Sequence, residues 1–268
     1  MLKDLRIGFI GWGKMAEAMI RGLLKGFVDS SQIIATGRSE ERGAELHKIH
    51  GIQTSTNNLE AVNADVIVLS VKPHDMPIVL SEVGASIAPA STVISIAAGI
   101  RLEKLAAAMS TLNIIRAMPN TPGRINKGIT VWTHFATIDA ERKIQVGALL
   151  GALGEEVHVD KEIYIDMTTA VSGSGPGIFD YILEAYIDSS VRLEMPRHLA
   201  KRLALATMIG TAEYARQVDV HLAQLCDDVT SAGGTTGEAI YQLDKAGFRA
   251  TLADALMAAY QRSLKLGE

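Results

Sequence analysis

Short runs of apolar residues alternate with segments of helical spacing in the first part of the chain. The apolar run Ile7–Ile10 is followed at once by Met15, Met19 and Leu23, which lie four residues apart. Asp65–Val71 is a near-continuous β-branched run, typical of a strand that a parallel sheet buries on both faces. The other predicted strands are Gln32–Thr36, Ile52–Thr54, Ser91–Ala97, Asn113–Met118, Gly128–Trp132 and Glu156–Val159. Helical segments between them, such as Met76–Ile87, Leu102–Met109 and Ala140–Leu150, predict a doubly wound sheet.

The pattern changes near residue 160, and strand signals disappear from there on. Pro176–Leu193 carries an apolar stripe at helical spacing, which includes Phe179 and Tyr186. Further helices are predicted over Arg197–Arg216, Thr236–Ala246 and Arg249–Leu264. The predicted fold class is therefore α/β, with an N-terminal Rossmann-type doubly wound sheet (residues 1–160) followed by an all-helical C-terminal domain (residues 161–268).

Composition and charge narrow the classes of partner. The formal net charge is −4, which gives no electrostatic reason to expect nucleic acid or an anionic membrane. Apolar runs fall short of the roughly 20 residues that span a bilayer. The single cysteine, Cys226, allows no intrachain disulfide, so we expect a reducing, cytoplasmic location. The seven histidines lack metal-ligand spacing, and no metal site is predicted.

The first strand ends in Gly11-Trp12-Gly13-Lys14-Met15-Ala16, and a helix follows directly. In this GxGxxA pattern Gly11 allows a tight turn and Gly13 lets the backbone approach a pyrophosphate, while Ala16 lets helix and strand pack closely. The unpaired N–H groups at the start of the helix favour a bound phosphate. Although small residues also serve plain helix–strand packing, the position in a βαβ pattern predicts a dinucleotide site.

The second strand is followed by Gly37, Arg38 and Ser39, and it ends at Thr36. No Asp or Glu stands here to hold the ribose 2′-OH of NAD. Arg38 with hydroxyl neighbours suits a 2′-phosphate instead, which favours NADPH as the cofactor over NADH. The alternative is that Arg38 is an ordinary surface arginine.

Ligands of open parallel sheets bind beyond the carboxyl ends of the strands. At such positions stand Val71-Lys72-Pro73, Ala97-Ala98-Gly99 and the stiff turn Met118–Pro122. Further on, the loop Thr230–Thr236 places hydroxyls and unshielded backbone N–H groups before a helix expected over Gly237–Leu243. That loop predicts a carboxylate-binding site. A flexible linker or a helix cap explains the same loop equally well.

Six segments carry a likeness that covers nearly the whole chain: GFIGWGKMAEAM, SVKP, AAG, AMPNTP, SGSGP and DDVTSAGGTTGEAIYQLD. In these segments the chain resembles the pyrroline-5-carboxylate reductases. The resemblance implies NADPH- or NADH-dependent reduction of the cyclic imine Δ1-pyrroline-5-carboxylate to L-proline, the last step of proline biosynthesis. It also implies a helical dimerisation domain and homodimers assembled into a larger ring, such as a decamer.

The resemblance also implies the site residues. The cofactor-binding residues are Gly11, Trp12, Gly13, Lys14, Met15, Thr36, Arg38, Ser39, Asn57, Val71, Lys72, Pro73, Ala97 and Ala98. The substrate-binding residues are Glu162, Ser231, Gly233, Gly234, Thr235 and Thr236. Thr236 is also the catalytic residue, with its hydroxyl near the imine nitrogen. The chain departs from the family pattern at two places. Ala232 in place of Pro makes the substrate loop less stiff, and Gly177-Ile178-Phe179 in place of Ala-Tyr leaves room for a related cyclic imine acid as substrate.

Two other functions compete with imine reduction. A β-hydroxyacid dehydrogenase needs a proton donor or base at the reacting oxygen. No Lys or His occurs between Ser172 and Val191, the helix where such enzymes place a catalytic Lys. A protonated imine is already electrophilic, so hydride attack on it needs little acid–base help. A non-catalytic NADP-binding sensor is the second alternative, and it gives no reason for a carboxylate-binding loop at residues 230–236.

Overall fold

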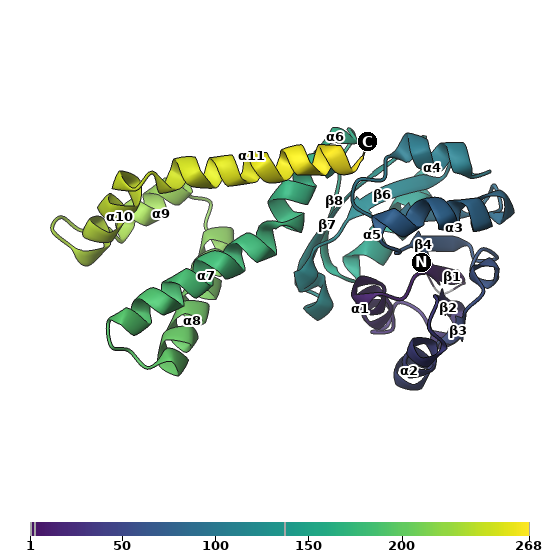
Figure 1. The fold of residues 1–268 in the computed structure, drawn as a ribbon, viewed down its shortest axis with the longest axis horizontal. Helices are drawn as coiled ribbons and strands as arrows, with labels where there is room; N and C mark the ends of the chain where they lie inside the picture. Colours follow the sequence, from purple (N-terminus) through teal and green to yellow (C-terminus); the bar gives the residue numbers. More distant parts are fainter. Residues whose placement is uncertain (1, 3, 137, 268) are drawn as a thin grey trace. The chain divides into compact units, whose positions relative to one another are not determined.

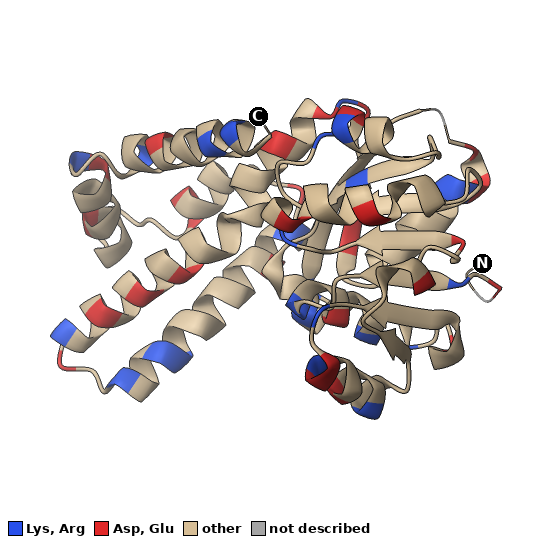
Figure 2. Cartoon of the chain, turned by 45° about the vertical axis from the view of Figure 1, so that its right-hand side comes forward, with Lys and Arg blue, Asp and Glu red and all other residues tan. Residues whose placement is uncertain are grey.

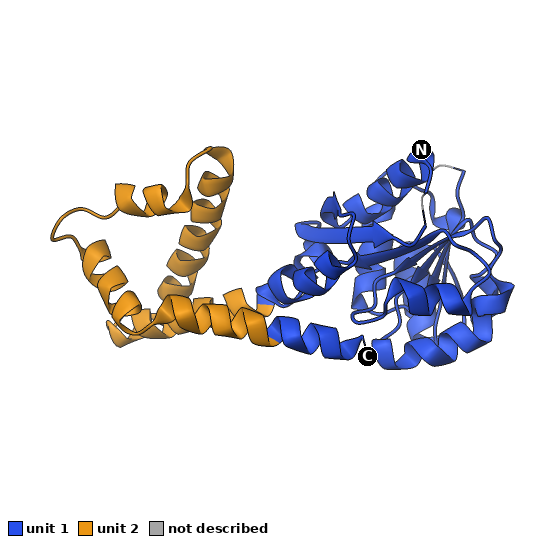
Figure 3. Cartoon of the chain, turned by 90° about the horizontal axis from the view of Figure 1, so that it is seen from above, with its two compact units in different colours: residues 1–176, 259–268 blue, residues 177–258 orange. Residues whose placement is uncertain are grey.

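The structure, a computed structural model, describes residues 2, 4–136 and 138–267. The chain divides into two compact units (Figure 3), unit 1 formed by Met1–Pro176 with Ala259–Glu268 and unit 2 by Gly177–Ala258. The domain boundary at residue 160 stays a prediction of the sequence, because these units are defined by contacts and unit 1 regains the last residues of the chain.

Unit 1 is built on one eight-stranded sheet with the order β3-β2-β1-β4-β5-β6-β7-β8 (Figure 1). The strands are β1 (Ile7–Ile10), β2 (Ile33–Thr36), β3 (Gln53–Ser55), β4 (Val66–Leu69), β5 (Thr92–Ser95), β6 (Ile114–Met118), β7 (Gly128–His134) and β8 (Gly154–His158). Neighbouring strands are parallel except β6 and β7, which run antiparallel with Ala117 opposite Trp132. The doubly wound sheet predicted from the sequence is confirmed.

Helices cover both faces of this sheet (Figure 1). The buried side chains of α1 (Lys14–Leu23), α2 (Glu40–His50) and α5 (Ala140–Gly151) belong to one apolar core. Those of α3 (Met76–Val83) and α4 (Leu102–Ala108) belong to a second core. Strands β1, β4 and β5 are buried along their whole length, as expected of parallel strands between two helical layers. The connecting 3₁₀ turns are η1 (Ser30–Gln32), η2 (Asn58–Glu60), η3 (Pro73–Asp75), η4 (Gly84–Ser86) and η5 (Thr121–Ile125).

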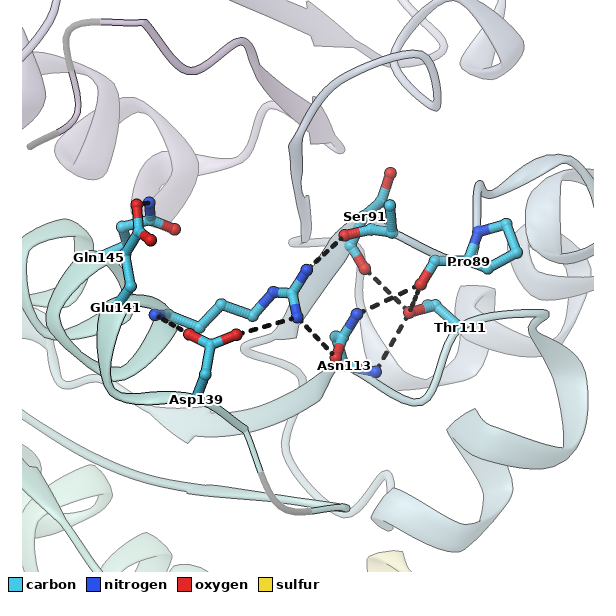
Figure 4. A network of polar contacts seen from close by, with 9 residues as sticks. Pro89, Ser91, Thr111, Asn113, Asp139, Glu141 and Gln145 are labelled. Carbon is cyan, nitrogen blue, oxygen red and sulfur yellow. Dashed lines mark hydrogen bonds and ion pairs between the residues drawn. The ribbon is translucent and has the colours of Figure 1, made fainter.

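A polar network joins α5 to the amino ends of β5 and β6 (Figure 4). Arg142 donates to Asn113 Oδ1 at 3.2 Å and to the carbonyl oxygen of Ala90 at 3.0 Å. Thr111 donates its hydroxyl to the carbonyl oxygen of Ser91 at 2.9 Å. These bonds satisfy loop groups at the edge of the sheet opposite the expected ligand site, so we assign them to stability.

Unit 2 is helical, as the sequence predicts. The helices are α7 (Gly175–Arg192), α8 (Arg197–Gln217), α9 (Leu222–Asp228), α10 (Thr235–Lys245) and α11 (Phe248–Leu266), of which α7 begins and α11 ends in unit 1. Before them come α6 (Ile163–Thr168) and a π-helical turn over Thr169–Gly173. The short helices α6 and α9, of six and seven residues, are not among the helices predicted from the sequence.

Apolar side chains in unit 2 lie mostly outside its core. The buried cluster consists of Ile187, Ala200 and Ala204, whereas Phe179 and Tyr186 are each 60% exposed. Acidic and basic positions are intermingled on both units (Figure 2). Within the described ranges, no helix is both long enough and apolar enough to span a membrane.

Candidate active site

A cleft of about 410 Å³ lies at the carboxyl ends of β1, β2 and β4. It is lined by Gly11, Trp12, Gly13, Gly37, Arg38, Ser39, Asn58, Ser70, Val71, Lys72, Asp75, Ile78, Val79 and Glu82. Seven of the predicted cofactor-binding residues are thus brought together: Gly11, Trp12, Gly13, Arg38, Ser39, Val71 and Lys72. The remaining seven, Lys14, Met15, Thr36, Asn57, Pro73, Ala97 and Ala98, are not among the lining residues in the described part of the chain, and their cofactor contacts stay predictions.

The glycine turn after β1 has the geometry that a dinucleotide needs. Gly11 adopts φ +98°, and a Cβ there would lie 2.9 Å from the backbone of Ser70. At Gly13, by contrast, a Cβ would meet nothing within 4 Å. Gly13 is also the N-cap of α1 and places no side chain over the first N–H groups of that helix. The open backbone at Gly13 and the uncapped helix therefore fit a pyrophosphate.

Trp12 fixes the turn that follows β2. Its side chain is only 9% exposed, and a Cβ on Gly37 would lie 2.3 Å from the indole ring. The ring also approaches Gly43 on α2, where a Cβ would lie 2.9 Å from it. Gly37 is thus required for close packing under the turn, and the indole supports the backbone that presents Arg38.

Arg38 reaches across the cleft to Asp75 on η3, with Nη2 3.3 Å from Oδ2. Ser39 is the N-cap of α2, and its Oγ accepts a hydrogen bond from the Arg42 N–H at 3.2 Å. Thr36 points into the protein instead, where its hydroxyl donates to Asn58 Oδ1 at 2.8 Å. Of these predicted residues, Arg38 presents its side chain most fully to a ligand, since it is 88% exposed.

Two neighbouring asparagines, Asn57 and Asn58, have different roles in the structure. Asn57, the predicted cofactor residue, caps η2 by accepting a hydrogen bond from the Leu59 N–H at 3.0 Å. Asn58 lines the cleft and donates to Glu82 Oε2 at 2.9 Å. Sequence reasoning missed Asn58, Ser70, Asp75 and Glu82. The sequence carries a signal for Ser70 alone, which is the first residue of the SVKP segment. Strand β4 ends at Leu69 rather than at Val71 as predicted, so Ser70 is the first residue beyond that strand.

The loop after β5 packs against the end of the chain. Gly99 has φ +76°, and a Cβ there would lie 2.6 Å from Leu266 in the last turn of α11. Ala97 is buried in the core beneath this loop. The C-terminal turn therefore fixes the position of the predicted cofactor residues Ala97 and Ala98.

Glu162, a predicted substrate residue, takes part in a charged cluster. Its Oε1 accepts hydrogen bonds from the Leu102 N–H and from Arg116 Nη1, each at 2.8 Å. Arg116 also pairs with Asp166, with Nη2 2.6 Å from Oδ1. Both bonds to Glu162 use the same oxygen, so neither requires Oε2. Sequence reasoning missed Arg116 and Asp166.

The predicted substrate loop lies in unit 2. Helix α10 begins at Thr235, one residue before the predicted helix at Thr236–Ala246 and two before the start expected at Gly237: Gly234 is the N-cap, and Thr235 and Thr236 form the first turn. Gly233 has φ +70°, and the Gly234 N–H donates to the carbonyl oxygen of Ser231 at 2.9 Å. Gly234 gives this helix no side-chain cap. The first-turn N–H groups and two threonine hydroxyls are therefore placed to bind an anion.

The described residues hold no group of three or more His, Cys, Asp or Glu side chains that could bind a metal ion.

Comparisons with known proteins agree with this assignment. Residues 162–266 match the family model described as pyrroline-5-carboxylate reductase dimerisation, and residues 6–99 match the model described as NADP oxidoreductase coenzyme F420-dependent. The chain is 38% identical to the pyrroline-5-carboxylate reductase of Synechocystis, with 99% of each chain covered. It is 40% identical to that of Pseudomonas aeruginosa, with 98% of this chain and 97% of the relative covered.

Solved structures show the same likeness. A pyrroline-5-carboxylate reductase from Coxiella burnetii superposes with a TM-score of 0.89 at 32% identity, covering 99% of this chain and 100% of the other. The Plasmodium falciparum pyrroline carboxylate reductase with NADP bound gives a TM-score of 0.90 at 28% identity, covering 99% of each chain. From its site geometry and its full-length similarity, the chain belongs to the pyrroline-5-carboxylate reductase family of NAD(P)H-dependent oxidoreductases.

Proposed function

We propose that this protein reduces Δ1-pyrroline-5-carboxylate to L-proline, with NADPH as the preferred cofactor and NADH as a second one. The observation that supports this substrate most strongly is the uncapped first turn of α10, which offers N–H groups and the hydroxyls of Thr235 and Thr236 to a carboxylate. The relatives named above as pyrroline-5-carboxylate reductases support the same reaction.

When bound, the cofactor supplies a hydride from C4 of its nicotinamide. The Gly11–Gly13 turn and the start of α1 bind the pyrophosphate, and Arg38 binds the 2′-phosphate of NADPH. The first turn of α10, with Ser231, Gly233 and Gly234 before it, binds the substrate carboxylate. The hydroxyl of Thr236 orients the protonated imine nitrogen, which keeps its proton as the neighbouring carbon is reduced.

Glu162 contributes its second carboxylate oxygen to the substrate in this proposal. Arg116 and the start of α4 hold the first oxygen, so the orientation of the carboxylate is fixed before substrate binds. Positioning of this kind is the main task of the protein in imine reduction, because the iminium carbon needs little acid–base help.

The test is a pair of assays with the purified protein. We expect NADPH oxidation with Δ1-pyrroline-5-carboxylate and no NADP reduction with a panel of 3-hydroxy acids. Activity only in the second assay would support a β-hydroxyacid dehydrogenase, and cofactor binding without turnover in either would support a sensor. A six-membered cyclic imine carboxylate, assayed beside the five-membered one, tests whether Ala232 and Gly177-Ile178-Phe179 alter the preferred ring size.

We also propose a homodimer assembled into a ring such as a decamer, and a cytoplasmic location. The match to the dimerisation model and the exposed apolar side chains of α7 and α8 support pairing through unit 2. Light scattering coupled to gel filtration gives the number of chains, and a mass of two chains would contradict the ring.

A further inference from the structure

Arg38 and Asp75 join the two walls of the cofactor cleft. Arg38 follows β2 and Asp75 ends η3 beyond β4, and β2 and β4 are the two neighbours of β1 in the sheet. The guanidinium nitrogens Nη1 and Nη2 lie 3.4 and 3.3 Å from Oδ1 and Oδ2 of Asp75. Because Gly11 and Gly13 line the same cleft, a dinucleotide on the glycine turn meets this ion pair.

The pair is loose and its partners differ in exposure. Charge-assisted hydrogen bonds to a carboxylate are usually about 2.7–2.9 Å long, shorter than both contacts here. The side chain of Arg38 is 88% exposed, whereas that of Asp75 is 19% exposed. An exposed pair of this kind is worth about 1 kcal/mol or less, so a phosphate dianion displaces Asp75 from Arg38 at little cost.

From this we infer that Asp75 is a specificity-determining residue, which competes with the 2′-phosphate of NADPH for Arg38 and so lowers the preference of the cleft for NADPH over NADH. NADH carries a hydroxyl at that position and leaves the ion pair intact. The inference rests on the proposed function, in which Arg38 is the phosphate-binding residue.

Glu82 supplies a matched comparison. It lines the same cleft and carries the same charge, but its Oε2 accepts a hydrogen bond from Asn58 Nδ2 at 2.9 Å instead of pairing with Arg38. A general effect of negative charge in the cleft would appear at Glu82 as well as at Asp75. An effect through Arg38 would appear at Asp75 far more strongly.

The experiment measures binding of 2′,5′-ADP and of 5′-AMP, which differ by the 2′-phosphate, to the full-length protein by calorimetry. We expect Asp75→Asn to tighten 2′,5′-ADP about threefold or more, within the range of an exposed ion pair, and to leave 5′-AMP unchanged. Glu82→Gln should give less than half of that gain. In an Arg38→Ala background the gain from Asp75→Asn should also fall by at least half. Asp75→Ser, measured alongside, provides a second neutral variant if Asp75→Asn folds poorly.

The inference would be overturned by equal tightening of both nucleotides, by an equal gain from Glu82→Gln, or by an undiminished gain without Arg38. If Arg38→Ala weakens both nucleotides equally, the proposed role of Arg38 fails and the inference fails with it. A selective effect of Arg38→Ala with none from Asp75→Asn refutes this inference alone. Binding is read without the imine substrate, so a failure of the proposed reaction is recognised separately.

Discussion

The guanidinium of Arg116 and the carboxylate of Asp166 form a buried ion pair, with side-chain exposures of 1% and 6%. Arg116 lies on β6 and Asp166 on α6, and Nη1, the other terminal nitrogen of the guanidinium, pairs with Glu162. A buried charge is tolerated only when its partners replace the lost water. The pair therefore fixes α6, and with it Glu162, to strand β6.

Arg116→Leu should destabilise the protein strongly, because it leaves the carboxylate of Asp166 buried without its partner. Breaking such a pair costs about 3–5 kcal/mol of unfolding free energy. The measurement is urea unfolding followed by circular dichroism at one fixed protein concentration. Arg249→Leu is the control, since it removes an exposed pair with Asp244 that is worth less than about 1 kcal/mol. Equal losses of unfolding free energy in the two variants would contradict the role of Arg116 as the partner of a buried carboxylate.

Arg116 shows where sequence reasoning stops in the fold. The apolar runs predict the central strands β1, β4 and β5 most clearly, because burial on both faces requires such runs. Within Asn113–Met118, however, Arg116 gives no sign of its partners, which lie 46 and 50 residues further along. The antiparallel direction of β7 and the short helices α6 and α9 also depend on tertiary contacts, and local pattern does not encode them.

In the candidate site, too, some residues can be predicted from the sequence and others cannot. Glycine spacing predicts the turn at Gly11 and Gly13 because that function is a backbone property. Asn57 and Asn58 are indistinguishable by type, and only the geometry of η2 decides which of them lines the cleft. The role of Asp75 cannot be predicted from the sequence, because only the order of the strands in the sheet brings it opposite Arg38.

His158 should make stability depend on pH in the weakly acidic range. Its ring stacks on His134 with centroids 5.1 Å apart, and its Nε2 is buried without a hydrogen-bond partner among the described residues. Burial, and then the charges of His134 and Lys143, lower the pKa of the His158 imidazole. The unfolded chain, with a pKa of about 6.5, therefore binds a proton that the folded state resists, and stability falls as pH drops below that value.

The measurement is the melting temperature between pH 7.5 and 5.5. His158→Gln removes the titrating ring, so we expect a smaller decrease on acidification than in the unaltered protein. His198→Gln, on the exposed surface of α8, controls for the loss of a histidine as such. A decrease as steep in His158→Gln as in the unaltered protein would exclude this origin of the pH dependence.

Thr236→Ala should lower kcat/KM for the imine about 10- to 100-fold, the effect of removing one hydrogen bond to a charged reacting group. NADPH affinity should stay unchanged, because Thr236 does not line the cofactor cleft. The measurements are steady-state kinetics and NADPH titration. Thr251→Ala removes a hydroxyl that donates to the carbonyl oxygen of Gly247, just before α11, and should change neither value. Equal losses of turnover and cofactor affinity in Thr236→Ala would show that the α10 start is structural.

Alanine at the two glycines of the turn should separate folding from cofactor binding. At Gly11, φ +98° and a Cβ 2.9 Å from Ser70 cause strain, so Gly11→Ala lowers the melting temperature as well as NADPH affinity. At Gly13, φ is −66° and a Cβ meets no protein atom within 4 Å, so the free protein keeps its stability. The added methyl group there lies where the pyrophosphate approaches the backbone, and we expect NADPH affinity to fall about tenfold or more. Calorimetric titration with NADPH and thermal melting of both variants check this. Unchanged NADPH binding in Gly13→Ala would show that the cofactor does not bind at this turn. A lowered melting temperature would show that Gly13 is needed for packing.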